Sequence, residues 1–135
     1  MNIAKLMIPK VYTAFLHEND TIRQGLECFT IHGYTAIPVL NEREQYIGSV
    51  TEGDFLRHVL ATGTTDLKEQ ERYRIKAIVR RDFCPALSID ADPAVVVSAT
   101  LDQNFVPIVD GRGTLCGILT RKSVIKYLSE AAGLG

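Results

Sequence analysis

The sequence lacks the features by which several large classes of protein are recognised. It has no apolar run near the ~20 residues that span a bilayer. Its 15 basic and 16 acidic residues give a net charge of −1, so we expect neither nucleic-acid binding through a basic face nor a polybasic membrane contact. The N-terminus lacks the hydrophobic core and cleavage site of a signal peptide. These absences predict a cytoplasmic protein.

Metal-site patterns and common catalytic motifs are also missing. Cysteine is scarce, and Cys28, Cys84 and Cys116 stand far apart, which predicts neither a disulfide framework nor a zinc site. The three histidines are not at ligand spacing. No Gly-x-x-x-x-Gly-Lys, Gly-x-Gly-x-x-Gly or Gly-x-Ser-x-Gly sequence occurs. With no base–nucleophile pair either, we do not expect an enzyme.

What the sequence does contain is one unit twice. Three pairs of identical residues stand 69 positions apart: Pro38 and Pro107, Gly48 and Gly117, and Thr51 and Thr120. Near the N-terminus the offset becomes 72, as between Ile3 and Ile75. We therefore predict repeats at residues 1–62 and 75–135, joined by a connector at 63–74. Each repeat alone would be only marginally stable, so we expect the two to form one body.

Periodicity and turn residues predict the same β-α-β-β-α order in both repeats. In the first repeat we expect strands at 11–16, 36–40 and 46–50 and a helix at 52–61. Another helix is expected to be capped by Asp20 or Thr21 and to end near His32, with Gly33 as its stop. In the second, Asp92 and Pro93 predict a helix start, although the valines that follow favour a strand. The expected fold class is α/β of the α+β type, with the two repeats packed sheet against sheet about a pseudo-two-fold axis.

The repeated segments also carry a family resemblance. They are residues 34–40 and 48–54 in the first copy, and 105–109 and 117–120 in the second. In this order and spacing they resemble the CBS-domain pair, the tandem cystathionine-β-synthase-type module also called a Bateman module. The resemblance covers residues 3–128 and implies a stand-alone CBS-domain protein. Such modules bind adenosine-containing ligands between their repeats, including AMP, ADP, ATP, cyclic di-AMP and S-adenosylmethionine.

The clearest single motif is Thr51-x-x-Asp54, at the junction of a predicted strand and helix. Backbone N–H groups and the helix dipole at such a junction favour a phosphate, and the Asp54 carboxylate can accept hydrogen bonds from both ribose hydroxyls. The same two residues also fit a capping box that serves only the helix. In the second copy Ser123 stands where Asp54 is expected. Because a hydroxyl binds a diol more weakly than a carboxylate does, we expect two unequal sites.

In the family, a carboxylate of one repeat works with an adenine pocket of the other. The resemblance thus implies a first cleft made by Thr51, Asp54, Cys84, Pro85, Ala86, Asn104 and Phe105. It implies a second, weaker cleft made by Lys10, Ala14, Tyr34, Thr35, Ile118, Thr120, Arg121, Lys122 and Ser123. We expect the adenosine moiety in the first cleft.

Several of these residues have an ordinary structural interpretation as well. Arg121 and Lys122 either contact phosphates or are solvated charges at a helix start. Tyr34 either stacks on a base or belongs to the half-buried core, and Cys84, with no activating base nearby in the sequence, fits a small apolar filler. The basic residues at 76–81 either face solvent or meet phosphates or an acidic partner.

The function that follows is a regulatory sensor of adenosine nucleotides, with no resident metal or cofactor, that acts on an unidentified protein partner. The alternative is a ligand-free dimeric adaptor that binds a protein partner. Both interpretations include a homodimer, which by resemblance would be a disc of four CBS repeats. The dimer is expected because helices carry wide apolar stripes: Phe55, Leu56, Val59 and Leu60 in one repeat, and Val124, Ile125 and Leu128 in the other.

Overall fold

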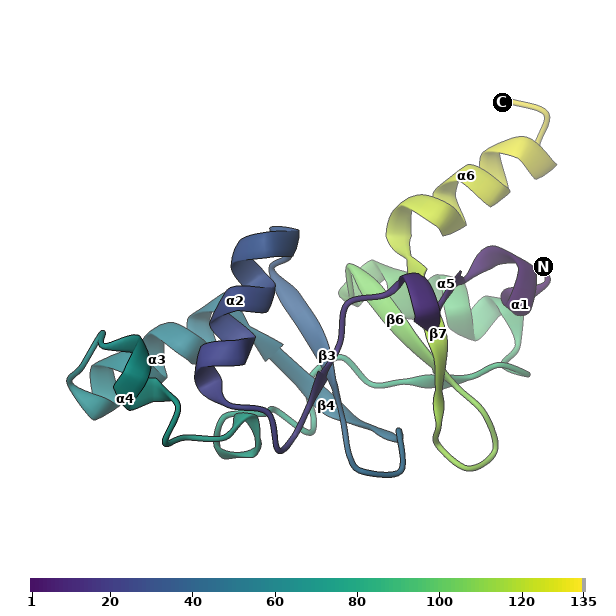
Figure 1. Cartoon of the computed structure of the whole chain (residues 1–135). Helices are drawn as coiled ribbons and strands as arrows, with labels where there is room; N and C mark the ends of the chain where they lie inside the picture. The colour runs from purple at the N-terminus through teal and green to yellow at the C-terminus, as the bar shows by residue number, and fades with distance from the viewer. Residues whose placement is uncertain (135) are drawn as a thin grey trace. The chain divides into compact units, whose positions relative to one another are not determined.

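The chain folds as two compact units, each with its own small sheet and helices (Figure 1). The computed structural model describes residues 1–134. The middle unit comprises Ala14–Phe83, and the split unit joins Met1–Thr13 to the chain from Cys84 onward. The predicted mixed α/β class is confirmed, with one sheet in each unit.

The middle unit has a three-stranded sheet and two long helices. Its elements are β2 (Leu16–His17), α2 (Ile22–His32), β3 (Ala36–Leu40), β4 (Tyr46–Thr51), α3 (Glu52–Thr62), α4 (Leu67–Gln70) and the 3₁₀ turn η2 (Ile75–Ala77). The strand order is β2-β3-β4, with β2 parallel to β3 and β3 antiparallel to β4. Beyond these strands, the backbone of Arg80 pairs with that of Ser49 in β4. Since α3 follows β4 with no loop between them, Thr51 lies at the junction.

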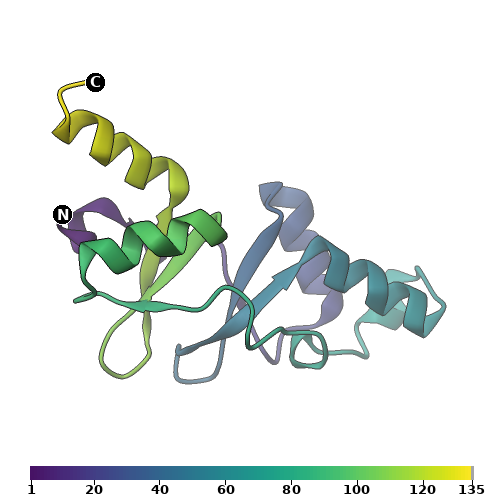
Figure 2. The ribbon, with the colours of Figure 1, turned by 180° about the vertical axis from the view of Figure 1, so that it is seen from behind.

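The split unit repeats this plan with an N-terminal addition. Its elements are α1 (Ile3–Leu6), β1 (Ile8–Pro9), the 3₁₀ turn η1 (Lys10–Tyr12), β5 (Leu87–Ser88), α5 (Pro93–Asp102), β6 (Phe105–Val109), β7 (Leu115–Thr120) and α6 (Arg121–Ala131). The strand order is β1-β7-β6-β5. Figure 1 shows the purple N-terminal segment beside β7, where Ile8 pairs with Ile118. Figure 2 shows α5 from behind, where it packs against the sheet that contains β6.

The compact units therefore divide the chain differently from its repeats. Residues 1–13 precede the first repeat's main body in the sequence, but they belong to the split unit. Residues 75–83, which begin the second repeat, belong to the middle unit. Each unit is thus completed by a segment that the chain supplies from elsewhere. The boundaries of the repeats and of the connector therefore remain predictions, because the compact units have different limits.

Local sequence explains where the helices begin and end. In α2, Thr21 and Gln24 form a reciprocal capping box, and Gly33 closes the helix with a φ of 66°. In α5, the Asp92 carboxylate accepts a hydrogen bond from the N–H of Ala94 (2.8 Å), and Pro93 occupies the first turn. The helices predicted at these places are confirmed. The valines of α5 are helical because packing of the buried helix face outweighs their modest strand preference.

The strand predicted at 11–16 is wrong. The chain forms the turn η1 there, and the strand is limited to Leu16–His17. The Thr13 hydroxyl donates to the Pro9 carbonyl (3.0 Å), and the Thr13 N–H donates to the Lys10 carbonyl (3.0 Å), which closes the turn. Val11 is exposed, so no buried face favours an extended conformation.

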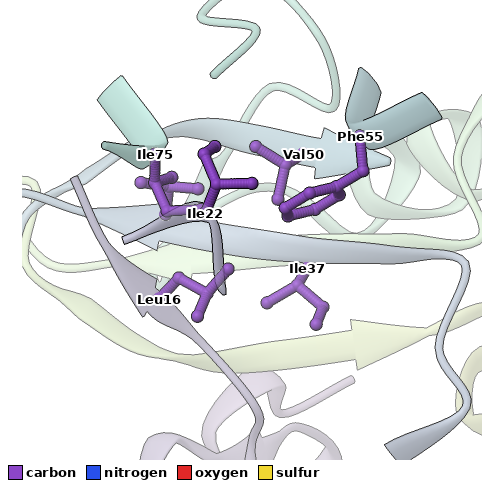
Figure 3. Packing of buried hydrophobic residues seen from close by; sticks show 7 residues of the cluster. Leu16, Ile22, Ile37, Val50, Phe55 and Ile75 are labelled. Carbon is purple, nitrogen blue, oxygen red and sulfur yellow. The ribbon is translucent and has the colours of Figure 1, made fainter. Parts of the chain in front are cut away.

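Each unit has its own hydrophobic core. In the middle unit the buried cluster contains Leu16, Ile22, Ile37, Val39, Val50, Phe55 and Ile75 (Figure 3). Phe55 projects from α3 beside Val50 of β4, and a side chain on Gly25 of α2 would meet the Phe55 ring at 2.6 Å. This packing fixes the first turn of α3 on the sheet. The core of the split unit contains Ile3, Val96, Val106, Ile108, Leu119 and Val124.

The apolar stripes predicted on the helices are only half buried within the chain. Phe55 and Val124 lie in the cores, whereas Leu60 is 81% exposed, and Leu56 and Ile125 are also exposed. Both α3 and α6 therefore keep an outer apolar face. None of the helices within residues 1–134 has the length and apolar character that a membrane span requires.

Candidate functional site

The candidate site in the middle unit lies where β4 ends and α3 begins. Thr51 is the N-cap of α3, and its hydroxyl accepts a hydrogen bond from the N–H of Asp54 (3.2 Å). In return, Oδ2 of Asp54 accepts from the N–H (2.8 Å) and the hydroxyl (2.9 Å) of Thr51. The capping box that was one interpretation of this motif is therefore present.

The other oxygen of Asp54 is held by two arginines. Oδ1 accepts from Arg57 (2.6 Å) and from Nε of Arg80 (3.1 Å), and the side chain is only 6% exposed. Burial by itself disfavours the charged form, but the hydrogen bonds from Thr51 and Arg57 and the charge of Arg80 outweigh it. The pKa of Asp54 is consequently lowered below its usual value. Asp54 is ionised at neutral pH and enclosed by cationic groups.

The position of Arg80 is itself well supported. Its N–H donates to the Ser49 carbonyl (3.0 Å) and its carbonyl accepts from the Ser49 N–H (3.1 Å). Its guanidinium lies over the ring of Phe83, 4.6 Å from the centroid. The Tyr46 hydroxyl bonds to the buried Ser49 hydroxyl (2.8 Å) and donates to the Phe83 carbonyl (3.3 Å). Arg80 is thus partly exposed and paired with Asp54 of its own chain, an arrangement that neither interpretation of the basic cluster included.

The equivalent junction in the split unit has no carboxylate. Thr120 is the N-cap of α6, accepts from the Ser123 N–H (3.1 Å) and shares a hydrogen bond with the Ser123 hydroxyl (2.7 Å). The guanidinium of Arg121 donates to the carbonyls of Thr100 (2.7 Å) and Leu101 (3.4 Å), near the C-terminal end of α5. Arg121 thus stabilises a helix end, while Lys122 is exposed.

Three of the residues predicted for the adenine pocket, Cys84, Pro85 and Phe105, are joined by hydrogen bonds in the split unit. The Cys84 thiol donates to the Phe105 carbonyl (3.2 Å). The Gln103 amide donates to the Cys84 sulfur and to the carbonyls of Pro85 and Phe105, each at 3.2 Å. Burial raises the pKa of the Cys84 thiol to about 11, although the hydrogen bond from Gln103 opposes this. The thiol is therefore protonated and unreactive at neutral pH, as expected for a filler.

The remaining predicted residues have the following places. In the split unit, Ala86 is half-buried, the Asn104 carbonyl accepts from the Arg121 N–H (3.0 Å), Ile118 lies in β7, and Lys10 begins η1. In the middle unit, Ala14 is half-buried, Tyr34 is exposed with its ring stacked on His32, and the Thr35 carbonyl accepts from the Glu52 N–H (3.3 Å). Both predicted clefts combine residues of the two units, so the clefts stay predictions.

Two contributors were missed by sequence reasoning. Arg57 stands three residues after Asp54, a spacing at which helical side chains meet, so the sequence could have predicted its ion pair with Asp54. Gln103 carried no comparable signal, because its partners at 84 and 85 are fixed only by the fold. Within residues 1–134, no group of three or more His, Cys, Asp or Glu side chains is placed to hold a metal ion.

The sequence matches a family model described as "CBS domain" at residues 3–61 and 75–130, which together make up most of the chain. Among curated relatives, an uncharacterised protein of Methanopyrus kandleri, MK0525, is 27% identical over 101 residues, which are 70% of this chain and 47% of that protein. The cyclic di-AMP receptor B of Bacillus subtilis is 21% identical over 128 residues, 95% of this chain and 86% of that protein. The chain thus spans about half the length of the first relative.

Solved structures agree with this match in fold. The CbpB protein of Listeria monocytogenes in complex with cyclic di-AMP superposes with a TM-score of 0.84, at 23% identity and with full coverage of both chains. CBSX2 in complex with AMP superposes with a TM-score of 0.76, at 17% identity, covering 97% of this chain and 98% of that one. At such identities the likeness establishes the fold alone.

Proposed function

The chain belongs to the CBS-domain family, as a tandem CBS pair, and on that premise we propose that it is a regulatory module that binds an adenosine nucleotide. Members of this family are typically non-catalytic regulatory modules. Ligand binding would change the conformation of the module or its affinity for a protein partner. The relatives that bind cyclic di-AMP and AMP support this class of ligand, and no resident cofactor is required.

The observation that carries the proposal is the buried carboxylate of Asp54 at the start of α3. An ionised carboxylate accepts two hydrogen bonds from a cis-diol, which is the group that a ribose presents. Two guanidinium groups and the N-terminal end of an eleven-residue helix lie beside it, and both favour phosphate. Carboxylate and cationic groups are therefore available side by side for the ribose and the phosphate of one nucleotide.

We assign the adenine to the residues gathered around Cys84 in the split unit. Gln103 and the thiol fix the carbonyls of Pro85 and Phe105, and backbone groups held in this way suit the recognition of a base edge. The second predicted cleft would bind more weakly, because Ser123 offers only a hydroxyl and Arg121 is already engaged with the end of α5.

The outer apolar faces of the helices support a homodimer. Leu56 and Leu60 on α3, and Ile125 and Leu128 on α6, are exposed, and exposed apolar residues that are neighbours on one helix mark an association site. The same faces would also serve the alternative function, a ligand-free dimeric adaptor. Light scattering of the pure protein at micromolar concentration tests the dimer, and a mass of 15 kDa would contradict it.

The test of the function is calorimetric titration of the chain with AMP, ADP, ATP, cyclic di-AMP and S-adenosylmethionine, with GTP as the control. We expect adenosine-specific binding that weakens by about 10- to 100-fold in Asp54→Ala, because hydrogen bonds to a charged group contribute about 1.5–3 kcal/mol. The matched variant Ser123→Ala should change it by less than about threefold. Asp54→Asn keeps the side-chain shape and removes only the charge. A loss of ligand binding in this variant as well would therefore come from the missing carboxylate and not from misfolding.

The outcomes separate the two functions. Binding that Asp54→Ala leaves intact would show that the site lies elsewhere. A folded dimer that binds none of these compounds would favour the adaptor and direct the search to protein partners.

A further inference from the structure

We propose that Arg57 makes the site selective for phosphorylated ligands, by holding Asp54 until a ligand phosphate takes its guanidinium instead. This inference rests on the proposed function, because it concerns the same carboxylate. It identifies a specificity residue and narrows the ligand class from adenosine compounds in general to those with an anionic phosphate group.

The first observation is an excess of positive charge around a single buried carboxylate. Arg57 and Arg80 both donate to Oδ1 of Asp54, while Oδ2 is occupied by Thr51. One carboxylate balances only one of the two guanidinium charges. The start of α3, where the helix dipole is positive, lies at the same place. These three side chains therefore carry a net charge of +1, and the other acidic group in the first turn of α3, Glu52, is exposed.

The second observation is that the two arginines are held very differently. Arg80 is fixed through its backbone pairing with Ser49 and through the Phe83 ring on which it lies. The Arg57 side chain is 64% exposed, and its guanidinium lies over Gly53, where an added Cβ would come within 3.2 Å of it. Arg57 is the group that can move, and the absent side chain at position 53 gives it room.

These two observations define an exchange. A ribose diol that binds Oδ1 of Asp54 must replace at least one guanidinium, and Arg57 is the easier one to replace. If the ligand carries a phosphate, the displaced guanidinium gains a new bidentate partner within reach. If the ligand is adenosine, the ion pair is broken with no new one formed.

The experiment compares AMP with adenosine, which share the ribose diol and differ only in the phosphate, as titrations of the full chain and of Arg57→Gln. In Arg57→Gln we expect phosphorylated ligands to bind about tenfold more weakly. Adenosine should bind equally well or a few-fold better, because Asp54 is easier to reach. Arg57→Lys keeps the positive charge but lacks the paired N–H donors of a guanidinium. Its affinity for phosphorylated ligands should lie between those of the wild type and Arg57→Gln. Arg72→Gln is the matched control, since Arg72 is also paired at a spacing of three, with Glu69 (3.1 Å).

The decisive result is a loss of affinity in Arg57→Gln that is confined to phosphorylated ligands. If both types weaken or strengthen together in Arg57→Gln, or if Arg72→Gln produces the same change, the inference is overturned while nucleotide binding stands. If neither AMP nor adenosine binds, and none of the other adenosine compounds named under the proposed function binds the wild type either, the proposed function itself fails, and this inference with it.

Discussion

The starts of α3 and α6 occupy equivalent places in the two units but are built from different chemistry. Each follows its strand directly, and each is capped by a threonine, Thr51 or Thr120. The residue three positions later is Asp54 in one and Ser123 in the other. The first junction is a buried ionic cluster, and the second is a pair of neutral hydroxyl groups. The repeated fold therefore provides a place for a site without determining what the site binds.

The backbone around the two junctions is nearly the same. A side chain on Gly48 would come within 2.4 Å of the Arg80 carbonyl oxygen, and one on Gly117 within 2.3 Å of the Ile8 carbonyl oxygen. In both units a segment from outside the β-α-β-β-α core passes close to a glycine in the second strand of the hairpin. Arg80 brings a guanidinium that reaches Asp54, whereas Ile8 brings only an aliphatic side chain. The difference between the junctions thus lies in side chains rather than in backbone path.

The comparison is tested most strongly by Asp54→Ser, which gives the first junction the arrangement of the second. We expect a loss of about 2 kcal/mol in the free energy of unfolding, because Arg57 and Arg80 lose their shared partner. The loss is kept moderate because the two arginine side chains are 64% and 43% exposed. Urea denaturation at pH 7 measures it. Ser123→Ala, which removes a neutral partner, should cost less than about 1 kcal/mol, and equal losses would contradict the comparison.

Acidification should reduce the amount by which Asp54 stabilises the first junction relative to the second. The pKa of Asp54 is lower in the folded protein than in the unfolded chain, so its contribution is present above the unfolded pKa, near 4, and is lost as the pH falls through the folded value. The stability gap between wild type and Asp54→Asn should therefore be full at pH 7 and shrink below about pH 4. The pKa of Asp110 is also lowered, by hydrogen bonds from the backbone of Arg112 and Thr114, but this contribution is common to both proteins. A gap that stays constant down to pH 2 would contradict the assignment.

The fold could be predicted from the sequence largely because its signals are local and occur twice. Caps and stops such as Thr21, Gly33 and Asp92 act within a few residues, and the structure has them at the predicted places. The strand predicted at 11–16 is wrong because Val11 is exposed and Thr13 closes a turn. Periodicity reports which residues are apolar, and burial depends on what the rest of the chain covers.

The candidate site could be predicted only in part. Thr51 and Asp54 were recognisable because a cap and a binding motif both need them at that spacing. The engagement of Asp54 with Arg80 depends on a segment 26 residues away, and that of Arg121 with the end of α5 on one about 20 residues away. Such long-range partners are determined by tertiary structure. A sequence motif therefore identifies the chemical groups of a site but not the hydrogen bonds and ion pairs that those groups already make.

The smallest effect is expected for Ser123→Asp, which is the reverse of Asp54→Ser because it gives the second junction the carboxylate of the first. A carboxylate at this position of α6 would complete a capping box with Thr120 and offset the cations of Arg121 and Lys122 in the first turn. We expect the free energy of unfolding to rise by about 0.5–1 kcal/mol at low salt, measured by urea denaturation. The gain should stay below the loss in Asp54→Ser, because Ile8 supplies no counterpart of Arg80. Ser129→Asp, which adds the same charge near the C-terminal end of α6, is the control and should be neutral or destabilising. Equal gains from both variants would mean that net charge, rather than the cap, is responsible.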